Sequence, residues 1–260
     1  MGSVGATTLP AKPRLEDEFE GYLGERSQEN AEDRLDRILD SPVNAPLINP
    51  HFEESSAYQE NCALCATALP LYVRGYDIEA MPRDAAWRGF NSVFNVDYSN
   101  PDNYMLGAAS ASSSPGLPRI SQDIVLGGKN RDYIMYDGKK VYFTPTPRGA
   151  DKVATAIDEK VKGWGDGAIG YLRVKWKTGV SAHAVNVINH NGQTILYDPQ
   201  DGSKLVGKVA ITNFLKGTRS VNTSLIRLDN APLKHKSGIT PDMQAYSKTW
   251  GKMFKRKEKK

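Results

Sequence analysis

The chain contains two cysteines, Cys62 and Cys65, which lie three positions apart. A thiol attacks carbon only as its thiolate, and an unperturbed thiol with a pKa near 8.5 is only about 3% ionised at pH 7. The start of a helix favours the thiolate, because the helix dipole and the free N–H groups stabilise negative charge there. Cys62 follows a polar stretch and begins an apolar run. We therefore predict that Cys62 is a nucleophile at a helix N-terminus, and that Cys65 faces the core or the helix flank.

A thiolate needs a histidine partner, and the chain offers four. Only His183 lies within a patterned strand, residues 181–188, whereas His51, His190 and His235 fall in loops, in an apparent turn or near the chain end. A strand holds a side chain in a fixed direction. We therefore expect His183 to be the base.

The next strand can be registered against His183. If Asn191-Gly192 is a two-residue hairpin turn, His183 lies opposite Gln200 and is a diagonal neighbour of Asp198, about 7 Å away at Cβ. A four-residue loop would place His183 directly opposite Asp198, whereas an odd loop or a bulge would separate them. The alternatives for each residue taken singly are an inert buried Cys62, a structural strand histidine and an ordinary turn at residues 198–202.

The elements that must position these residues follow from pattern. An apolar run from Cys62 to Arg74 predicts a buried helix, which Pro70 should bend or end early. Asp137-Gly138 predicts a hairpin. A helix is expected at 150–162, and strands at 76–81, 133–136, 140–143, 168–176, 181–188, 193–197 and 224–228. A helix followed by antiparallel strands indicates an α+β domain.

Charge divides the 260 residues into three parts. Residues 14–40 hold ten acidic residues and four arginines, whereas residues 234–260 hold nine Lys or Arg and two acidic residues. We predict an acidic N-terminal arm at 1–54, a catalytic domain at 55–233 and a basic C-terminal helix and tail at 234–260. The acidic arm contains a short surface helix ended by Ser41-Pro42. The basic helix begins at Thr240-Pro241 with one aromatic-rich face, made of Met243, Tyr246, Trp250 and Phe254.

The basic C-terminal helix has two interpretations: its aromatic side chains dock on the domain, or it contacts nucleic acid or another acidic surface. A composition of 39% hydrophobic and 25% charged residues excludes collagen, coiled coil and wholesale disorder. No apolar window is long enough for a transmembrane segment, and the first twenty residues lack the apolar region of a signal peptide. Two closely spaced cysteines favour reduced thiols and a cytoplasmic setting.

Four stretches together resemble the papain-fold toxin family, which includes glutamine deamidases of bacterial polymorphic toxins and phage-linked effectors. They are 61–65, 71–82, 181–187 and 197–202, within a likeness that spans 55 to about 230. The resemblance implies a papain-like cysteine hydrolase fold, with the nucleophile at a helix N-terminus packed on an antiparallel sheet. It implies Cys62 as nucleophile, His183 as general base and acid, Asp198 as the orienting carboxylate and Gln200 in support. The resemblance does not extend to either arm. Within its span, residues 83–167 form an insert that cannot be aligned with the family.

The expected reaction is hydrolysis of a glutamine side-chain amide on a target protein. The oxyanion would be held by the backbone N–H of Cys62 and the side-chain amide of Gln59 or Asn61. We expect no cofactor and no metal. The resemblance further implies an immunity or delivery protein as a partner. It also implies that this chain is cytoplasmic in the producing cell, or that it is virion-associated and delivered into a target cell.

Four alternatives remain at this stage. The same Cys-His-Asp triad serves cysteine proteases and acyltransferases. Cys62 and Cys65 at a helix start resemble a thioredoxin-type redox pair, although no strand precedes them. Zinc binding would need a second closely spaced pair of ligands. Finally, a non-enzymatic phage or virion-associated structural protein could carry a degenerate papain-like domain between its charged ends.

Overall fold

The computed structural model describes residues 26–83, 149–178, 181–219 and 223–231, together with the backbone of four further short strands. The elements in chain order are α2 (Ala31–Leu39), α3 (Cys62–Val73), β1 (Ile78–Ala80), β2 (Tyr104–Leu106), β3 (Tyr133–Tyr136), β4 (Lys139–Tyr142), α4 (Ala150–Gly163), β5 (Ile169–Lys175), β6 (Ala182–His190), β7 (Gln193–Tyr197), β8 (Lys204–Val206), α5 (Gly207–Leu215), β9 (Thr223–Arg227) and β10 (Phe254–Arg256). The expected strands in 76–81, 168–176, 181–188, 193–197 and 224–228 are confirmed, as are the helix at 150–162 and the β3–β4 hairpin.

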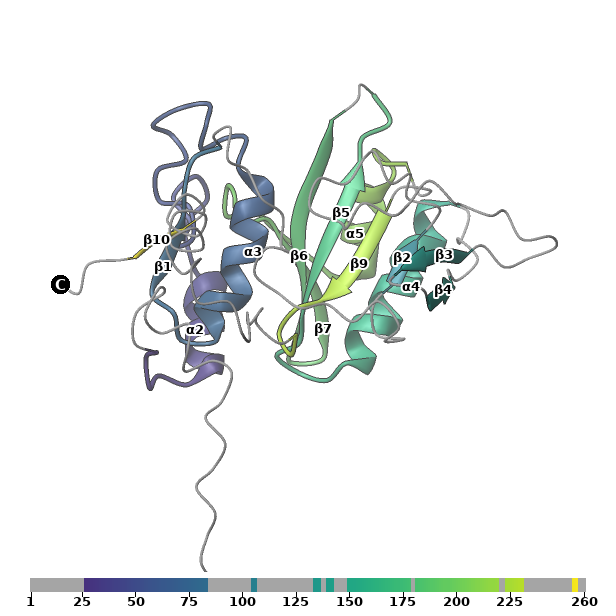
Figure 1. Ribbon diagram of the computed structural model, residues 1–260, viewed down its shortest axis with the longest axis horizontal. Helices are drawn as coiled ribbons and strands as arrows, with labels where there is room; N and C mark the ends of the chain where they lie inside the picture. The colour runs from purple at the N-terminus through teal and green to yellow at the C-terminus, as the bar shows by residue number, and fades with distance from the viewer. Residues whose placement is uncertain are drawn as a thin grey trace, which may run out of the picture.

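A six-stranded antiparallel sheet in the order β2-β9-β5-β6-β7-β8 forms the centre of the fold (Figure 1). Side chains alternate between its two faces, so that Tyr171 packs with α2, α3 and β1 while Leu172 packs with α4 and α5. Two apolar clusters, one on each face, therefore hold the helices against the sheet. The α+β class predicted from the sequence is confirmed.

Helix α3 is apolar on all sides, and every residue in it except Cys62 is buried. Pro70 was predicted to bend the helix or to end it early; the early end is wrong, because the helix continues to Val73 with Pro70 inside it. Pro70 has no N–H to bond the carbonyl of Ala66. The side chain of Asn186 on β6 supplies that bond instead, with Nδ2 donating to Ala66 O at 3.0 Å. The same contact fastens the helix to the sheet.

The hairpin between β6 and β7 has the predicted register. Asn186 lies opposite Tyr197 and His190 opposite Gln193, which leaves Asn191 and Gly192 as a two-residue turn. Both turn residues have positive φ, 52° and 72°, as a type I′ turn requires. His190 is therefore the last residue of β6 rather than a turn residue.

Strand β8 and helix α5 were not predicted from the sequence. Helix α5 buries Ile211 and Leu215, one turn apart, against the sheet. Apolar residues one turn apart are a sign of a helix. In this stretch the apolar pattern covers only about two turns and comes soon after a run of turn residues, so it did not stand out in the sequence. Strand β8 is three residues long and pairs only with β7 among the described strands.

The predicted acidic-arm helix is present as α2, and it ends before Ser41 as expected. It buries Leu35, Ile38 and Leu39 in the same apolar cluster as α3. The arm is thus packed on the Cys62 helix along part of its length. The division of the chain at residue 54 stays a prediction.

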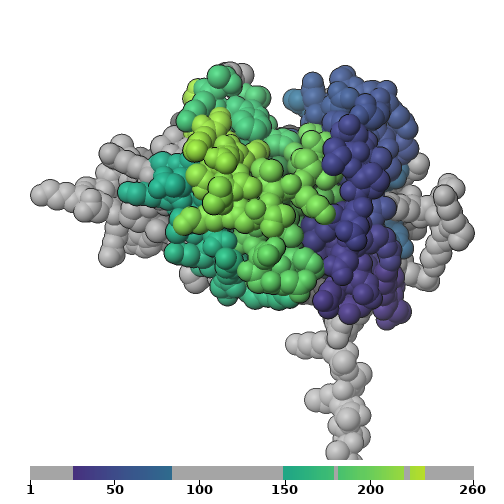
Figure 2. All heavy atoms as spheres, turned by 180° about the vertical axis from the view of Figure 1, so that it is seen from behind, coloured from purple at the N-terminus to yellow at the C-terminus, as the bar shows by residue number. Residues whose placement is uncertain are grey.

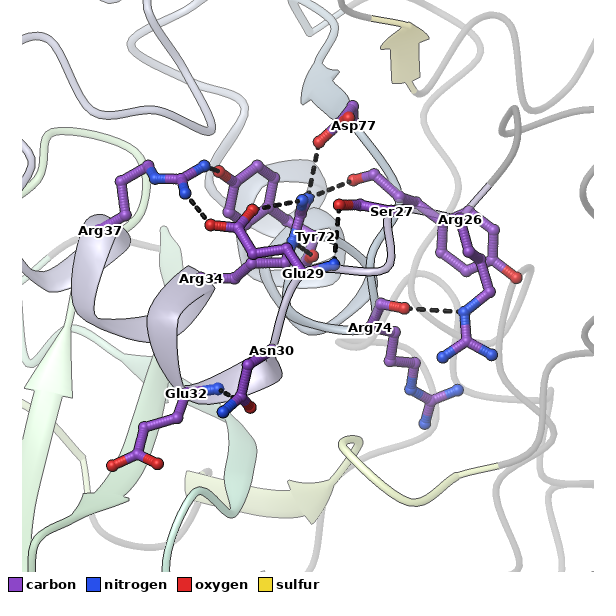
Figure 3. A network of polar contacts seen from close by, with 11 residues as sticks. Arg26, Ser27, Glu29, Asn30, Glu32, Arg34, Arg37, Tyr72, Arg74 and Asp77 are labelled. Atoms are coloured by element: carbon purple, nitrogen blue, oxygen red, sulfur yellow. Dashed lines mark hydrogen bonds and ion pairs between the residues drawn. The ribbon is translucent and has the colours of Figure 1, made fainter.

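Arg34 fixes α2 to the C-terminal end of α3 (Figure 3). Its side chain is buried, and it donates to the carbonyl of Tyr72 at 2.6 Å and to Asp77 Oδ1 at 2.8 Å. The guanidinium also lies 3.9 Å from the centre of the Tyr72 ring. Glu29 joins it by a 3.3 Å ion pair and also contacts Arg37.

The predicted basic C-terminal helix and the 83–167 segment lie largely outside the main described ranges. Phe254, predicted to lie on the face of the basic helix, instead begins strand β10, which pairs with β1. The remainder of that helix, with Met243, Tyr246 and Trp250, lies outside the described residues. In the 83–167 segment, residues 84–148 also lie outside the described residues, apart from the backbone of β2, β3 and β4.

Candidate active site

Cys62 is the first residue of α3, and it is partly exposed while the rest of the helix is buried. The preceding residue, Asn61, ends the loop and accepts the first helical bonds through its carbonyl, from Leu64 N at 2.8 Å and Cys65 N at 3.1 Å. Its side chain does not cap the helix. The first N–H groups of the helix, including that of Cys62, are therefore left for a bound group. This is the position predicted for a nucleophilic thiol.

His183 lies between a carboxylate and this thiol. Its Nε2 contacts Asp198 Oδ2 directly, and the side chains are only 15% and 12% exposed. The thiol of Cys62 lies close enough to the ring to raise the pKa of His183. Because Nε2 is taken by the carboxylate, Nδ1 is the ring nitrogen left for the sulfur. The predicted neighbourhood of His183 and Asp198 is confirmed, and the structure brings Cys62 to the same place.

The surroundings of His183 favour its protonated form. Burial by itself lowers the pKa of His183, but the hydrogen bonds and negative charges of Asp198 and Cys62 raise that pKa to about 10. The ring is then an imidazolium at neutral pH. It can pair with a thiolate and donate a proton to a leaving group.

Asp198 is held by the turn that follows β7. Its Oδ1 accepts from the backbone N–H of Gln200 at 3.0 Å, while its own carbonyl accepts from Gly202 N at 2.8 Å. The interpretation of residues 198–202 as a turn is thus correct, and the turn is what aims Oδ2 at His183. The structural and the functional interpretations of Asp198 are compatible.

Cys65 is fully buried one turn after Cys62, as predicted. Burial raises the pKa of the Cys65 thiol well above its ordinary range, and the charges of Cys62 and Asp198 raise it further. Its Sγ donates to Asn61 Oδ1 at 3.1 Å. A buried, protonated thiol is a poor nucleophile and a poor redox partner, so these contacts favour Cys62 as the reactive cysteine.

The three predicted supporting residues occupy different positions. Gln59 is exposed in the turn before α3, whereas Asn61 and Gln200 are buried. Both N–H bonds of the Asn61 amide are used, one to Asn49 Oδ1 at 3.2 Å and one to the carbonyl of Met81 at 3.0 Å. Gln200 Nε2 donates to Asn61 Oδ1 at 3.3 Å. This arrangement favours Asn61 and Gln200 as supports of the site and leaves Gln59 as the side-chain candidate for an oxyanion donor.

Trp176 is a site residue that the sequence analysis missed. Its ring stacks on that of His183, with centroids 5.9 Å apart and planes 21° from parallel, and Phe214 of α5 packs edge-on against it at 5.6 Å. Its backbone N–H bonds to Ser181 O, so the end of β5 lies beside the start of β6. Both strands were predicted from the sequence, but their pairing was not, so the sequence did not bring Trp176 to His183. The indole covers one face of the imidazolium.

Arg173 places a positive charge near the thiol. It lies opposite Ala184 on β6 and opposite Ser224 on β9, two small residues that leave room for its side chain. Burial lowers the pKa of the Arg173 guanidinium, while the charges of Tyr171 and Cys62 raise it. The Arg173 guanidinium and the Cys62 thiol therefore interact through space.

The second residue missed is Asn49, from the segment predicted to be an arm. It is fully buried, and it bonds the carbonyl of Tyr58 and the side chain of Asn61 in the loop before Cys62, and the carbonyl of Gln200 in the Asp198 turn. No sequence signal identified it, because its partners lie up to 151 positions away.

Within the described ranges, no group of three or more His, Cys, Asp or Glu side chains is arranged to hold a metal ion. None of the helices in that part of the chain combines the length and the apolar character needed to cross a bilayer.

Comparison with known proteins gives one family. The family model for "papain fold toxin 1, glutamine deamidase" matches residues 60–203, a range that includes Cys62, His183 and Asp198. Among solved structures, the chain is similar to the crystal structure of the Pseudomonas avirulence protein AvrPphB, with 14% identity and a TM-score of 0.24. That similarity covers 38% of this chain and 51% of the other, so the chain spans about half the length of this relative. No curated protein matches the chain.

Proposed function

Because the chain belongs to the papain fold toxin family of glutamine deamidases, we propose that it hydrolyses the side-chain amide of a glutamine on a target protein. Cys62 is the nucleophile, His183 the general acid and base, and Asp198 the carboxylate that orients the ring. A toxin of this family acts on a protein, so the substrate is a folded partner or an exposed segment of one.

One observation carries the proposal: the imidazole of His183 contacts the Asp198 carboxylate and interacts with the thiol at the start of the helix. A nucleophile hydrogen bonded to a base, which a third group orients, is the arrangement that activates cysteine and serine nucleophiles. The partial exposure of Cys62 leaves the sulfur open to a substrate, whereas Cys65 has no such access.

In the first half of the reaction, the Cys62 thiolate attacks the amide carbon of the glutamine side chain and forms a carbon–sulfur bond. The carbonyl oxygen takes the electron pair and is stabilised by the N–H of Cys62 and by the Gln59 amide. The imidazolium of His183 donates its proton to the amide nitrogen. The carbon–nitrogen bond then breaks, ammonia leaves and a thioester remains.

In the second half, neutral His183 removes a proton from water, and the resulting hydroxide attacks the thioester carbon. The carbon–sulfur bond breaks, which regenerates the Cys62 thiolate and the His183 imidazolium, and the side chain leaves as glutamate. Asp198 keeps the ring in place through both halves. It stabilises the charged form without itself changing protonation state.

The proposal is tested by incubating the full chain with lysates of bacterial and eukaryotic cells. Mass spectrometry should find glutamine converted to glutamate at specific positions of one or a few proteins, together with ammonia release. New peptide termini would instead indicate a protease, and a new amide bond to an amine would indicate an acyltransferase. Either result would replace deamidation as the assigned reaction.

A pair of cysteine variants identifies the nucleophile. Cys62→Ala should abolish the reaction while the protein stays folded, because it removes the attacking atom and leaves the buried face of α3 unchanged. Cys65→Ser is the matched control and should stay active, since serine can still donate to Asn61. Activity retained in Cys62→Ala and lost in Cys65→Ser would transfer the nucleophile to Cys65.

A further inference from the structure

Asn49 lies in the segment before α3, outside the residues that match the family model. Its side chain is fully buried. Its Nδ2 donates to the carbonyl of Gln200 at 2.8 Å and to the carbonyl of Tyr58 at 3.0 Å. Its Oδ1 accepts from the Asn61 side chain at 3.2 Å. One amide thus joins the loop that leads into Cys62 to the turn that carries Asp198.

These bonds connect chain segments that are otherwise far apart in sequence. Tyr58 and Asn61 belong to the approach to α3, and Gln200 lies two residues after Asp198, whose Oδ1 it holds. A shift of the Asn49 amide would therefore move the helix start relative to the Asp198 turn. Those are the two elements between which His183 must fit.

The segment that contains Asn49 is held firmly against the Asp198 turn. Asn44 N donates to Asp201 O at 2.6 Å, and Lys204 Nζ donates to Leu39 O at 2.7 Å. The backbone of Pro42 also approaches Gly202 closely, because a Cβ at Gly202 would meet the Pro42 carbonyl oxygen at 2.7 Å. The φ of Gly202 is +81°, a conformation that favours glycine. Seen from behind, the purple N-terminal residues lie directly against the green residues near 200 (Figure 2).

We propose that Asn49 is a positioning residue, which sets the place of the Cys62 helix start relative to Asp198 and so assembles the thiol, imidazole and carboxylate. The catalytic part of this inference rests on the proposed function. A polar side chain buried among backbone carbonyls fixes direction as well as distance, which an apolar residue of similar size does not. Displacement of a reacting group by about 1 Å lowers an enzymatic rate by roughly a hundredfold.

The test compares Asn49→Ala and Asn49→Asp with Ile48→Ala in the full chain. The Asp variant keeps the volume and the acceptor for Asn61 but loses both N–H donors, so it remains informative if the Ala variant does not fold. Ile48 is the neighbouring buried side chain, it packs in the apolar cluster, and its side chain makes no polar contact. Ile48→Ala therefore reports the effect of lost stability alone.

The first readout is the rate at which iodoacetamide alkylates Cys62 at about pH 6, located by mass spectrometry, where an ordinary thiol is less than about 1% ionised. Both Asn49 variants should slow this alkylation by about tenfold or more. Ile48→Ala should alter the rate by less than about twofold, even with an equal fall in melting temperature. The second readout is kcat and KM for ammonia release from the blocked dipeptide carbobenzoxy-Gln-Gly: the Asn49 variants should lower kcat with KM little changed.

An unchanged alkylation rate in both Asn49 variants would overturn the inference. So would an equal slowing in Ile48→Ala, because the effect would then follow stability rather than position. A wild-type protein that releases no ammonia, in lysate or from the dipeptide, but whose Cys62 alkylation still depends on Asn49, would contradict the proposed function and leave the positioning role supported.

Discussion

His183 is the residue on which the charged groups of the site, Asp198 and Cys62, both act. The carboxylate of Asp198 and the thiol of Cys62 both favour its charged form, while Trp176 covers one face of the ring and restricts its contact with water. The burial penalty on the imidazolium is outweighed because both of its neighbours carry or can carry negative charge. A protonated ring at neutral pH suits the first chemical step, which needs a proton donor.

The raised pKa of His183 predicts how stability depends on pH. An ordinary histidine has a pKa of 6.5, and in the folded protein the value is about 10. The folded state therefore binds the proton more tightly, so this contribution to stability is fully present below about pH 6.5 and is lost as pH rises through about 10. Urea unfolding of wild type and His183→Gln should show a difference that shrinks by at least about 1 kcal/mol across this range.

The control for this experiment is His190→Gln, which removes a histidine at the opposite end of β6, beside Asp36 and Asn191 rather than at the site. Parallel pH curves for wild type and His183→Gln would show that the ring is not held in its charged form by Asp198 and Cys62.

At the scale of elements, α3 and β6 form the pair that brings sulfur and imidazole together. Cys62 and Ala66 lie one turn apart on α3, whereas His183 and Asn186 lie on the extended strand β6. The Asn186 bond to Ala66 O fills the vacancy that Pro70 creates in the helix. The carbonyl that Pro70 leaves without a helical hydrogen bond is therefore the point at which β6 is attached to α3.

This attachment predicts coupling between Pro70 and Asn186. Asn186→Ala should lower the free energy of unfolding by about 1–3 kcal/mol, because two buried carbonyls, those of Ala66 and Gly170, lose their donor. In a Pro70→Ala background, the new N–H can bond Ala66 O, so the same substitution should cost about 1 kcal/mol less. Urea unfolding of the four proteins measures the cycle. Strictly additive effects would show that Asn186 does not serve the carbonyl that Pro70 leaves free.

At the scale of the whole molecule, the residues on the two faces of the sheet have different tasks. The cluster with α4 and α5 supports the sheet from the side away from α3. The cluster with α2, α3 and β1 supports the nucleophile's helix, and the segment 26–54, which contributes to that cluster, also contains Asn49. The Arg34 network (Figure 3) attaches this segment to the end of α3, and the Asn49 bonds attach it to the loop before α3 and to the Asp198 turn.

The Arg34 network predicts a large stability effect at a distance from the site. Arg34→Met should lower the free energy of unfolding by about 3 kcal/mol, because it removes a buried charge that bonds Asp77 and the carbonyls of Tyr72 and Tyr76. Arg37→Met is the matched control: Arg37 is 50% exposed, and its loss should cost less than about 1 kcal/mol. Urea unfolding compares the two. Equal losses would show that the Arg34 network does not anchor the segment.

Local chemistry in the sequence determined several features of this protein. Asn191-Gly192 specifies a type I′ turn, and that turn sets the register of β6 against β7, next to which Asp198 follows. A polar loop followed by an apolar run specifies the helix start at Cys62 and the burial of Cys65. Each of these depends on residues close together in the chain, where spacing and geometry are directly linked.

Only the tertiary structure decided the rest. The continuation of α3 past Pro70, the stacking of Trp176 on His183 and the role of Asn49 all depend on partners from distant segments. The segment around Asn49 was predicted to be an acidic arm because its charge and its short helix are typical of a solvated surface. A buried amide has no periodicity or composition that marks it, since its function lies in which carbonyls the folded chain brings within reach.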